Sequence, residues 1–341
     1  MLAIFDSVFS YAISDVIATF FDPRKRIFLG YLVCAMVIAL FYWVIIRKRD
    51  FFDSVKSLFS KKVWMSASAK ADYKILIVNK LFMLLVSPIL LSQLAMATAI
   101  FFLLYDFFPS RPQLSNSWSV LPVSITFTVF YFLLDDFARF YVHRLMHRWP
   151  LLWAFHKVHH SAQRLTPLTV LRTHPVEMVI FSTRSVFVQA ISIGVFIFFL
   201  GDNADLVTVY GAMMFSFVFN VLGSNLRHSH VAIGYWQGFE RWFISPAQHH
   251  IHHSIAEKHW DKNYGVALSV WDRLFGSFCY SESNQRLAFG VKGINKHSLH
   301  SIYIEPLQEG AGLVKQFFVR CHKKIHSLYY RYSKVVILWK Y

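Results

Sequence analysis

Cysteine is scarce in this sequence of 341 residues, and its scarcity excludes two kinds of architecture. The three cysteines, Cys34, Cys279 and Cys321, are too few and too widely separated to form a disulfide framework. The same separation excludes a metal site built from thiolates. So few thiols fit a protein of a reducing compartment.

Acidic residues are also few. Asp and Glu number 19 against 35 Lys and Arg, which gives a formal net charge of +16 at pH 7. Such a charge suits either a nucleic acid or an anionic membrane surface. The basic residues flank hydrophobic segments, and no nucleic-acid-binding motif accompanies them. We therefore expect contacts with lipid headgroups and no nucleic-acid partner.

A cleavable signal peptide is not expected. Residues 1–21 have no basic start, and they carry Asp6 and Asp15 within an apolar pattern. This combination predicts an interfacial helix over residues 1–26, which would lie on the membrane and not cross it.

Long polar stretches are missing, whereas apolar residues make up 55% of the chain and the mean hydropathy is +0.40. A soluble domain of this length is far less apolar. The sequence therefore predicts an all-α integral membrane protein with four to five transmembrane helices. Four uncharged runs of spanning length, and a fifth interrupted only by Arg184, lie at 27–46, 81–105, 117–134, 206–226 and 178–201.

Basic residues are unevenly distributed around the first run. Three of them, at 24–26, precede it, and eight lie between residues 47 and 74. The positive-inside rule places the 47–74 loop in the cytoplasm. Counting the alternating runs from there puts every histidine cluster on that side. We expect a histidine-rich helical cap on the cytoplasmic face of a bacterial inner membrane or of the endoplasmic reticulum.

A single membrane-embedded catalytic domain is expected over residues 27–300, since we find no internal repeat beyond the histidine clusters and no low-complexity linker. From Gly310 onward the chain holds seven Lys or Arg, no Asp or Glu, and interleaved aromatic residues. This pattern predicts a basic tail over residues 301–341 that lies on the membrane surface. A solvated basic helix is the alternative.

Histidine is abundant, and twelve of the 17 histidines fall between His143 and His253. His143 and His147 are four residues apart, which places both on one face of a helix that continues the 117–134 run. The pattern H-x-x-H-H occurs twice, at 156–160 and 249–253, and offers the same helical neighbours. These spacings are typical of metal-binding helix faces.

Ten histidines are candidate metal ligands: the eight in these patterns, and two more in the segment NLRHSH at 225–230, whose spacing is less diagnostic. Ten imidazoles are too many for one metal ion and suit two ions of coordination number five or six. Asp136 lies seven residues before His143, on nearly the same helix face, so we expect it to accept an imidazole N–H. His250 is expected to point elsewhere. The ten candidates are His143, His147, His156, His159, His160, His228, His230, His249, His252 and His253.

Histidines outside these patterns are assigned differently. A lone histidine at a helix end is usually an interfacial residue, and we place four on the surface for that reason. The role of His259 stays open. The four surface histidines are His297, His300, His322 and His326.

Several functions remain compatible with a histidine site. Imidazole binds iron, zinc, copper and nickel, so ligand type alone does not select the metal. Zinc hydrolases use three protein ligands and an open position, and the surplus here favours two redox-active metals that carry out oxygen chemistry on a lipid. A metal transporter is the main competitor, but transport needs polar residues near the bilayer midplane and these histidines gather at the ends of the runs.

Six motifs together resemble the fatty acid hydroxylase / sterol desaturase superfamily, over roughly residues 130 to 280. Each motif alone is weakly specific, and the ordered set is highly specific. The resemblance implies an integral-membrane di-iron oxygenase that uses two Fe ions, O₂ and two externally supplied electrons. The motifs are HRLMH at 143, HKVHH at 156, RTHPVE at 172, the His228 motif, SPAQHHIHHS at 245 and DKNYG at 261.

The resemblance also carries individual residues. It matches the ten ligands and implies that His174 and Asp261 lie near the site and support it. Many members have one histidine followed two residues later by asparagine in the third motif, where this chain has His230. His230 is therefore either a ligand or a neighbour of the ligands. The sequence shows no fused haem-binding domain, so we expect a separate electron donor, either cytochrome b5-like or a ferredoxin with its reductase.

The reaction that we expect is hydroxylation of a C–H bond in a lipid, whether fatty acyl, alkylglycerol or sterol-like. Hydroxylation is favoured because it is the commoner outcome in the family, and desaturation at the same site is the alternative. We expect the apolar walls of the helix bundle to admit the lipid laterally and to hold it beneath the metals.

Overall fold

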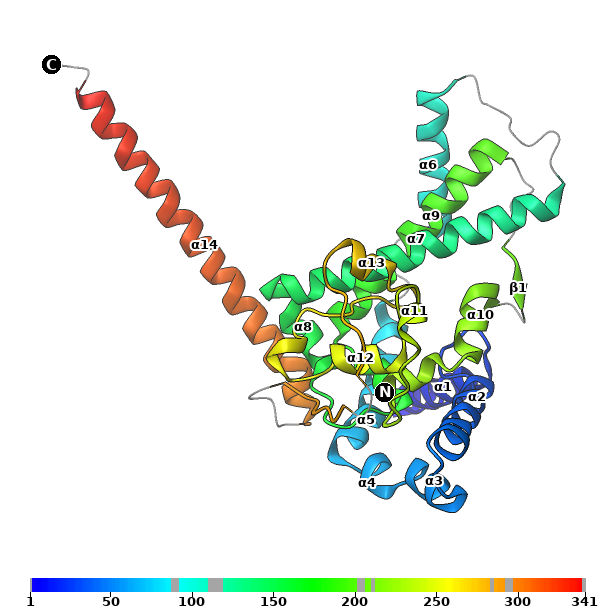
Figure 1. Cartoon of the computed structure of the whole chain (residues 1–341). Helices are drawn as coiled ribbons and strands as arrows, with labels where there is room; N and C mark the ends of the chain where they lie inside the picture. Colours follow the sequence, from blue (N-terminus) through cyan, green and yellow to red (C-terminus); the bar gives the residue numbers. More distant parts are fainter. Residues whose placement is uncertain are drawn as a thin grey trace.

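The computed structural model describes residues 2–86, 92–109, 119–200, 206–209, 212–282, 285–291 and 297–338. Within these ranges the regular elements are helices, apart from two isolated β-bridges and one antiparallel hairpin of two-residue strands, in which Thr208 pairs with Met213 and Val209 with Ala212. Long helices form an arm and a tail, and short helices and loops form a compact head between them (Figure 1).

The elements follow one another as helices of very different length. From the N-terminus to residue 148 they are α1 (Leu2–Phe21), α2 (Leu29–Phe41), the π-helical η1 (Tyr42–Ile46), α3 (Phe51–Leu58), α4 (Lys61–Trp64), α5 (Ala67–Val86), α6 (Gln93–Phe107) and α7 (Val120–Arg148). The remaining ones are α8 (Pro150–His160), η3 (Pro167–Leu171), α9 (Pro175–Leu200), β1 (Thr208–Val209), β2 (Ala212–Met213), α10 (Met214–Val221), η5 (Ser224–His228), α11 (Gln237–Glu240), α12 (Pro246–His252), η6 (Glu257–His259), α13 (Val270–Leu274) and α14 (Leu299–Leu338).

Three helices of the described chain are long and apolar enough to cross a membrane: Leu29–Ile46, Val120–Arg148 and Pro175–Leu200. The helix α6 is apolar but shorter, with 15 residues. These segments agree with an integral membrane protein that is mostly helical.

Two of the expected spanning runs are not single helices in the described residues. The run 206–226 holds the hairpin, the eight-residue α10 and the start of η5, so the prediction of a spanning helix there is wrong. Gly223 ends α10 with a left-handed φ of 87°, a conformation that glycine adopts without strain. The run 81–105 is shared between α5 and α6, and residues 87–91 between them lie outside the described part.

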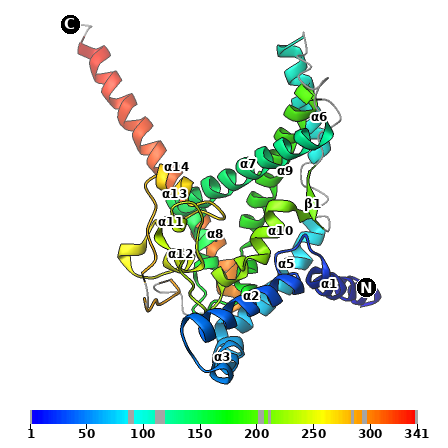
Figure 2. The same ribbon diagram turned by 45° about the vertical axis from the view of Figure 1, so that its right-hand side comes forward.

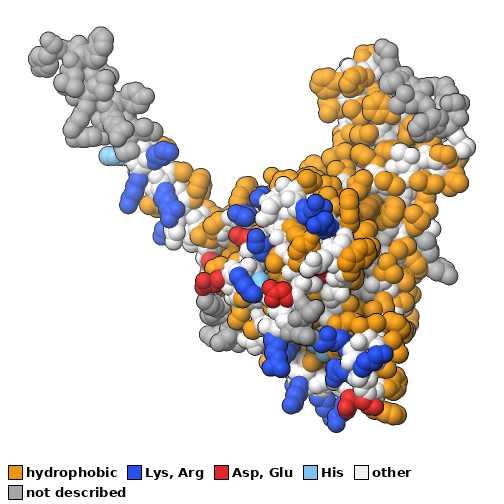
Figure 3. Space-filling view, viewed as in Figure 1, with side chains coloured by type: hydrophobic (Ala, Val, Ile, Leu, Met, Phe, Trp, Pro, Cys, Tyr) orange, Lys and Arg blue, Asp and Glu red, His pale blue; other side chains and the backbone are white. Residues whose placement is uncertain are grey.

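The arm consists of α6, α7 and α9, which lie together in both ribbon views (Figure 2). Phe127 of α7 packs against Phe196 of α9, with ring centroids 4.8 Å apart. Gly194 lets α6 approach α9 closely, because a Cβ added there would lie 2.8 Å from Ile100 and 3.1 Å from the carbonyl oxygen of Ala97. Hydrophobic side chains cover the arm in the space-filling view (Figure 3).

The helix α2 lies alongside the head, and both of its flanks contact one short segment. Arg26 donates to the carbonyl of Ser224 at 2.8 Å, while His230 Nε2 lies 3.1 Å from the carbonyl of Ser57. The placement of the two flanks of α2 on opposite membrane faces stays a prediction.

The tail begins inside the head. The helix α14 starts at Leu299, and its first turns pack on α8, where a Cβ at Gly310 would lie 3.1 Å from the ring of Phe155. Beyond this contact α14 projects away from the head and carries basic side chains (Figure 3). Its position on a membrane surface stays a prediction.

The close approach of α6 and α9 makes a matched pair of glycine substitutions informative. Gly194→Ala should lower the free energy of unfolding by about 1–3 kcal/mol, because the added methyl meets the backbone of α6. Gly312→Ala should leave stability unchanged or raise it by about 0.5–1 kcal/mol, since nothing lies within 4 Å of that position. Thermal unfolding of the detergent-purified protein measures both. Equal stability of the two variants would contradict the packing of α6 on α9.

Candidate metal centre

Nine histidines converge in the head as two neighbouring groups, and within each group one ring nitrogen per residue lies within 4.8 Å of all the others. Eight of the nine side chains are buried and His147 is partly exposed. The first group has five members and the second has four. They are His143, His147, His156, His160 and His252, and then His159, His228, His249 and His253.

Local sequence explains how the helices deliver these side chains. The helix α7 brings His143 and His147 on one face, and Pro150 at the first turn of α8 lets the chain reverse at once. The helix α12 begins with a capping box between Ser245 and Gln248, so its register is set just before its histidines. In each H-x-x-H-H motif the middle histidine belongs to one group, and the other two histidines belong to the other group.

The second group is compact. His228 Nε2 lies 3.1 Å from His159 Nε2, 3.0 Å from His249 Nε2 and 3.2 Å from His253 Nε2. His249 and His253 are 3.2 Å apart at the same atoms. A neutral imidazole carries one N–H, so the three mutual contacts among His228, His249 and His253 cannot all be hydrogen bonds.

Hydrogen-bond acceptors on the outer side of the rings decide which ring nitrogen carries the proton and which one keeps a lone pair. His143 Nδ1 lies 2.8 Å from the carbonyl of Tyr264, and His252 Nδ1 lies 2.9 Å from the carbonyl of Lys262. His156 Nδ1 lies 2.9 Å from Glu177 Oε1. These acceptors require N–H at Nδ1, which leaves a lone pair on Nε2, directed inward. The Nε2 atoms of His147, His156, His160 and His252 are buried without a hydrogen-bond partner.

Burial keeps these rings neutral. Desolvation lowers the pKa of His252 to about 3. It also lowers the pKa of His228, His249 and His253 well below the usual value, and neighbouring imidazoles lower it further. Neutral imidazole is the form that binds a metal ion.

The donor set fits metal ions. Nitrogen–metal bonds of about 2.1 Å place neighbouring ligand nitrogens roughly 3.0 to 3.4 Å apart, as in the second group. A cation between the nitrogens would pair with every inward lone pair, which no hydrogen-bond arrangement achieves. The residues present therefore suit two metal ions, with five and four imidazoles.

Residues around the two groups hold the rings in place. Glu177, in the first turn of α9, is buried and accepts from His156. His174 accepts from the backbone N–H of Val176 at 3.1 Å, and its other ring nitrogen lies 3.2 Å from the carbonyl of Tyr303 on α14. It thereby fixes the start of the helix that carries Glu177.

Asp136 supports the site differently from the expectation. Its carboxylate accepts from the backbone N–H of Ala267 and Leu268, at 2.9 and 3.1 Å, and from the indole of Trp271 at 3.0 Å. These donors, and not an imidazole, occupy the buried carboxylate. Asp136 thus anchors the loop whose Tyr264 carbonyl orients His143.

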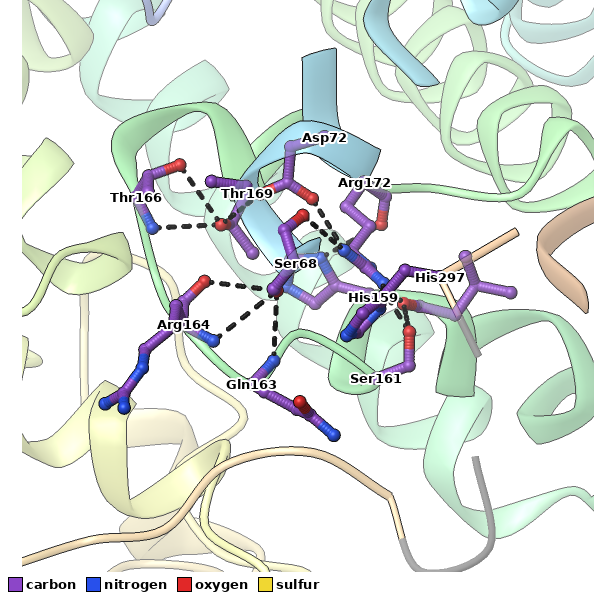
Figure 4. Close-up of polar contacts among 12 residues, drawn as sticks. Ser68, Asp72, His159, Ser161, Gln163, Arg164, Thr166, Thr169, Arg172 and His297 are labelled. Carbon is purple, nitrogen blue, oxygen red and sulfur yellow. Dashed lines mark hydrogen bonds and ion pairs between the residues drawn. The ribbon is translucent and has the colours of Figure 1, made fainter. Parts of the chain in front are cut away.

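A buried network behind His159 ties the site to α5 (Figure 4). Arg172 forms an ion pair with Asp72 at 2.8 Å, and both side chains are fully buried. Its guanidinium also donates to the carbonyls of Val158 and Ser68. The carbonyl of Arg172 lies 3.3 Å from His159 Nδ1, so the ion pair fixes the segment that orients this ring.

The remaining candidates lie apart from the two groups. His230 faces the ring of Trp43 and the carbonyl of Ser57, and belongs to neither group. Asp261 has a positive φ of 60°, and it accepts from the hydroxyl of Tyr264 at 2.6 Å. His250 is buried but also belongs to neither group, as expected.

Two histidines left outside the candidates have polar partners. His259 lies 2.9 Å from the hydroxyl of Ser254. His297, which we assigned to the surface, is half-buried, and its Nδ1 accepts from Arg172 at 2.9 Å. Arg172 needs this partner because its guanidinium is wholly enclosed.

The selection of site residues from the sequence missed Glu177, Tyr264 and the Arg172–Asp72 pair. Glu177 and Arg172 stand in the RTHPVE motif and Tyr264 in DKNYG, so the motifs held the signal. Asp72 had no such signal, because it lies about 100 residues from Arg172 in the chain.

The histidines separate two cavities. One, of about 390 Å³, is lined by His143, His156, His159, His228 and His249 together with residues of α7 and α9. The other, of about 430 Å³, is lined by His147, His160, His252 and His253 together with Trp153, Trp260 and Asp261. Each metal-binding group therefore contributes to both cavities.

Residues 128–277 match the family model described as fatty acid hydroxylase. The chain carries a fatty acid hydroxylase domain. All nine converging histidines lie within it. No solved structure matches the chain significantly.

Curated relatives of this domain act on different lipids. The chain is 26% identical to the alkylglycerol monooxygenase of Homo sapiens over 164 residues, which is 47% of this chain and 32% of the relative. It is 30% identical over 161 residues to a Delta(7)-sterol 5(6)-desaturase of Gibberella zeae, covering 47% and 43% of the two chains. It is 28% identical over 159 residues to an ornithine lipid hydroxylase of Rhizobium tropici, covering 46% and 43%. The chain thus spans about a third to under half of the relatives' length.

Removing the carboxylate that orients His156 should weaken metal binding without removing a ligand. Glu177→Ala should lower metal affinity about 10–100-fold, the range typical for loss of a carboxylate behind a ligating histidine. Competition with a chelator measures the affinity. The exposed Glu282→Ala is the matched control and should bind metal as the unaltered protein does. Unchanged affinity in Glu177→Ala would show that Glu177 does not orient a ligand.

Proposed function

We propose that this protein is a membrane-bound di-iron oxygenase that hydroxylates a C–H bond of a lipid. The observation that carries the proposal is the pair of histidine groups, whose ring nitrogens converge at metal-binding distances from one another. Iron is favoured over zinc because the domain belongs to an oxidoreductase family and because nine neutral imidazoles exceed what a zinc hydrolase uses.

Two iron ions, when bound by the two groups, would supply the activation of O₂ that an unreactive C–H bond requires. The residues of the chain hold and orient the rings. Glu177 and the carbonyls of Tyr264 and Lys262 keep the protons at Nδ1, away from the centre. The cavity beside five of the histidines offers a place where the lipid is held.

Electrons come from a separate donor in this proposal. The second cavity, which contains the exposed Trp260 at its rim, is the side from which we expect the donor to approach, while the lipid uses the first. The site is proposed to face the cytoplasm, of a bacterium or at the endoplasmic reticulum, as the basic loop 47–74 indicates.

Hydroxylation is favoured over desaturation by two of the relatives reported above, an alkylglycerol monooxygenase and an ornithine lipid hydroxylase. The sterol desaturase supports the alternative. Both reactions begin with removal of hydrogen from a C–H bond, so the same arrangement of histidines serves either.

Activity should depend on the converging histidines and not on histidines elsewhere in the chain. His156→Ala should reduce product formation at least 100-fold, because it removes a ligand of the first group. The exposed His322→Ala on α14 should leave activity unchanged. The measurement is lipid mass spectrometry of cells grown under ¹⁸O₂, with iron content determined on the purified protein.

The mass shift also decides between the reactions. Incorporation of one ¹⁸O atom supports hydroxylation, and loss of two hydrogens without ¹⁸O supports desaturation. A protein that holds no iron, or whose variants lose activity equally, would contradict the proposed centre.

A further inference from the structure

Arginines line the cavity beside the histidines. We expected apolar walls, but four guanidinium groups face this cavity, and a smaller one of about 160 Å³ shares three of them and adds Arg24. The four come from the segment before α2, from α7, from α9 and from η5, so separate parts of the chain contribute to one feature. They are Arg26, Arg139, Arg184 and Arg227.

Helix periodicity places these charges directly beneath the site. Arg139 precedes His143 by four residues on α7, and Arg184 follows Glu177 by seven on α9, so each shares a face with a residue of the centre. At 1.5 Å per residue they lie roughly 6 and 10 Å further along their helices. Charged side chains within apolar membrane helices are expensive and usually functional.

Carboxylates neutralise only part of this charge. Asp135 pairs with both Arg139, at 2.8 Å, and Arg184, at 2.7 Å. The carboxylate of Asp136 is occupied by the loop, and that of Glu177 by His156. These hydrogen bonds do not remove the charge of either carboxylate, but four arginines against three carboxylates still leave an excess of positive charge.

Arg26 and Arg227 carry the excess. Arg227 is 2% exposed, donates to the carbonyls of Ser224 and Val266, and makes no ion pair within the described ranges. Arg26 donates to Ser224, its Nε is buried without a partner, and it too has no carboxylate partner among the described residues.

A buried and a partly buried cation side by side, neither paired with an anion, are unfavourable, because carbonyl groups do not offset the lost hydration of a full charge. Guanidinium groups with free N–H bonds match the oxygens of a carboxylate or phosphate. The cavity thus offers the positive charge and the N–H donors that an anionic group requires. They lie beside His228, which follows Arg227 in the chain.

We propose that Arg26 and Arg227 bind the anionic headgroup, a carboxylate or phosphate, of the lipid substrate. This inference rests on the proposed function and specifies its substrate class. Because the same cavity is lined by the arginines and by His228, the oxidised carbon lies near the polar end of the lipid and not at the far end of its hydrocarbon chain.

Binding is tested with lipids that differ only in the charged group. The full chain, loaded with iron, is reconstituted in phosphatidylcholine nanodiscs, and the apparent Kd is measured for dioleoyl phosphatidic acid against dioleoylglycerol, and for oleate against oleyl alcohol. At least one anionic lipid should bind tenfold or more tightly than its neutral partner, the range for hydrogen bonds to charged groups. Equal affinity within both pairs overturns the proposal.

Variants show which residue causes the preference for the anionic lipid. Arg26→Gln should reduce the anionic-to-neutral affinity ratio about tenfold, and Arg26→Lys should retain part of it. Lys25→Gln removes the same charge from the adjacent residue, which lines neither cavity, and should leave the ratio unchanged. A ratio that survives Arg26→Gln, or that falls equally in Lys25→Gln, overturns the assignment. If Arg26→Gln does not fold, the wild-type lipid pairs decide alone.

Two further measurements distinguish the lipid site from a free-anion site, and this inference from the proposed function. Inorganic phosphate that binds in the absence of any lipid preference would show a free-anion site and overturn the lipid assignment. Turnover separates this inference from the proposed function: equal oxidation of phosphatidic acid and dioleoylglycerol overturns the substrate class alone. An Arg26-dependent preference without O₂ consumption supports the anion site and overturns the oxygenase.

Discussion

Nine imidazoles directed at one another in a buried space are the constraint on which the head of this protein depends. In the first group, outer acceptors hold the protons at Nδ1 on three rings, so lone pairs are left on their Nε2 atoms. In the second group, nitrogens 3.0–3.2 Å apart cannot all be hydrogen-bonded to one another, and burial removes the water that would otherwise separate them. Only cations satisfy all of them at once, so the arrangement of the head favours metal binding.

Holding the rings in this arrangement requires support from distant parts of the chain. Asp72 on α5 fixes Arg172, whose carbonyl faces His159, and Asp136 on α7 fixes the loop that orients His143. His174 sets the start of α9 and links it to α14. The short helices and loops of the head are therefore determined by buried polar contacts more than by hydrophobic packing.

The charges around the centre are arranged in layers. Neutral imidazoles occupy the centre, and arginines with fewer carboxylates lie beside it along α7 and α9. This order places positive charge next to the proposed site of oxidation. An anionic lipid would pair with Arg26 and Arg227, whereas an uncharged lipid would leave these two cations without a paired anion.

The sequence by itself determined the helical class and nearly all of the candidate ligands. Helical periodicity brings residues three or four apart onto one face, so H-x-x-x-H and H-x-x-H-H were sufficient to identify eight of the nine converging histidines. The ninth, His228, lies outside both patterns. Hydropathy identified α2, α7 and α9 as apolar enough to span a membrane, but failed at 206–226, where a hairpin and Gly223 interrupt the apolar run.

Only the tertiary structure decided how the ligands divide into two groups, that His230 lies outside both, and that Asp136 binds a loop. It also decided that Arg26 lies beside Arg227, two hundred residues later, and that Asp72 pairs with Arg172. These facts depend on contacts between segments far apart in the chain. Local periodicity carries no information about such contacts, because they are set by how whole helices pack and by which buried charges find partners.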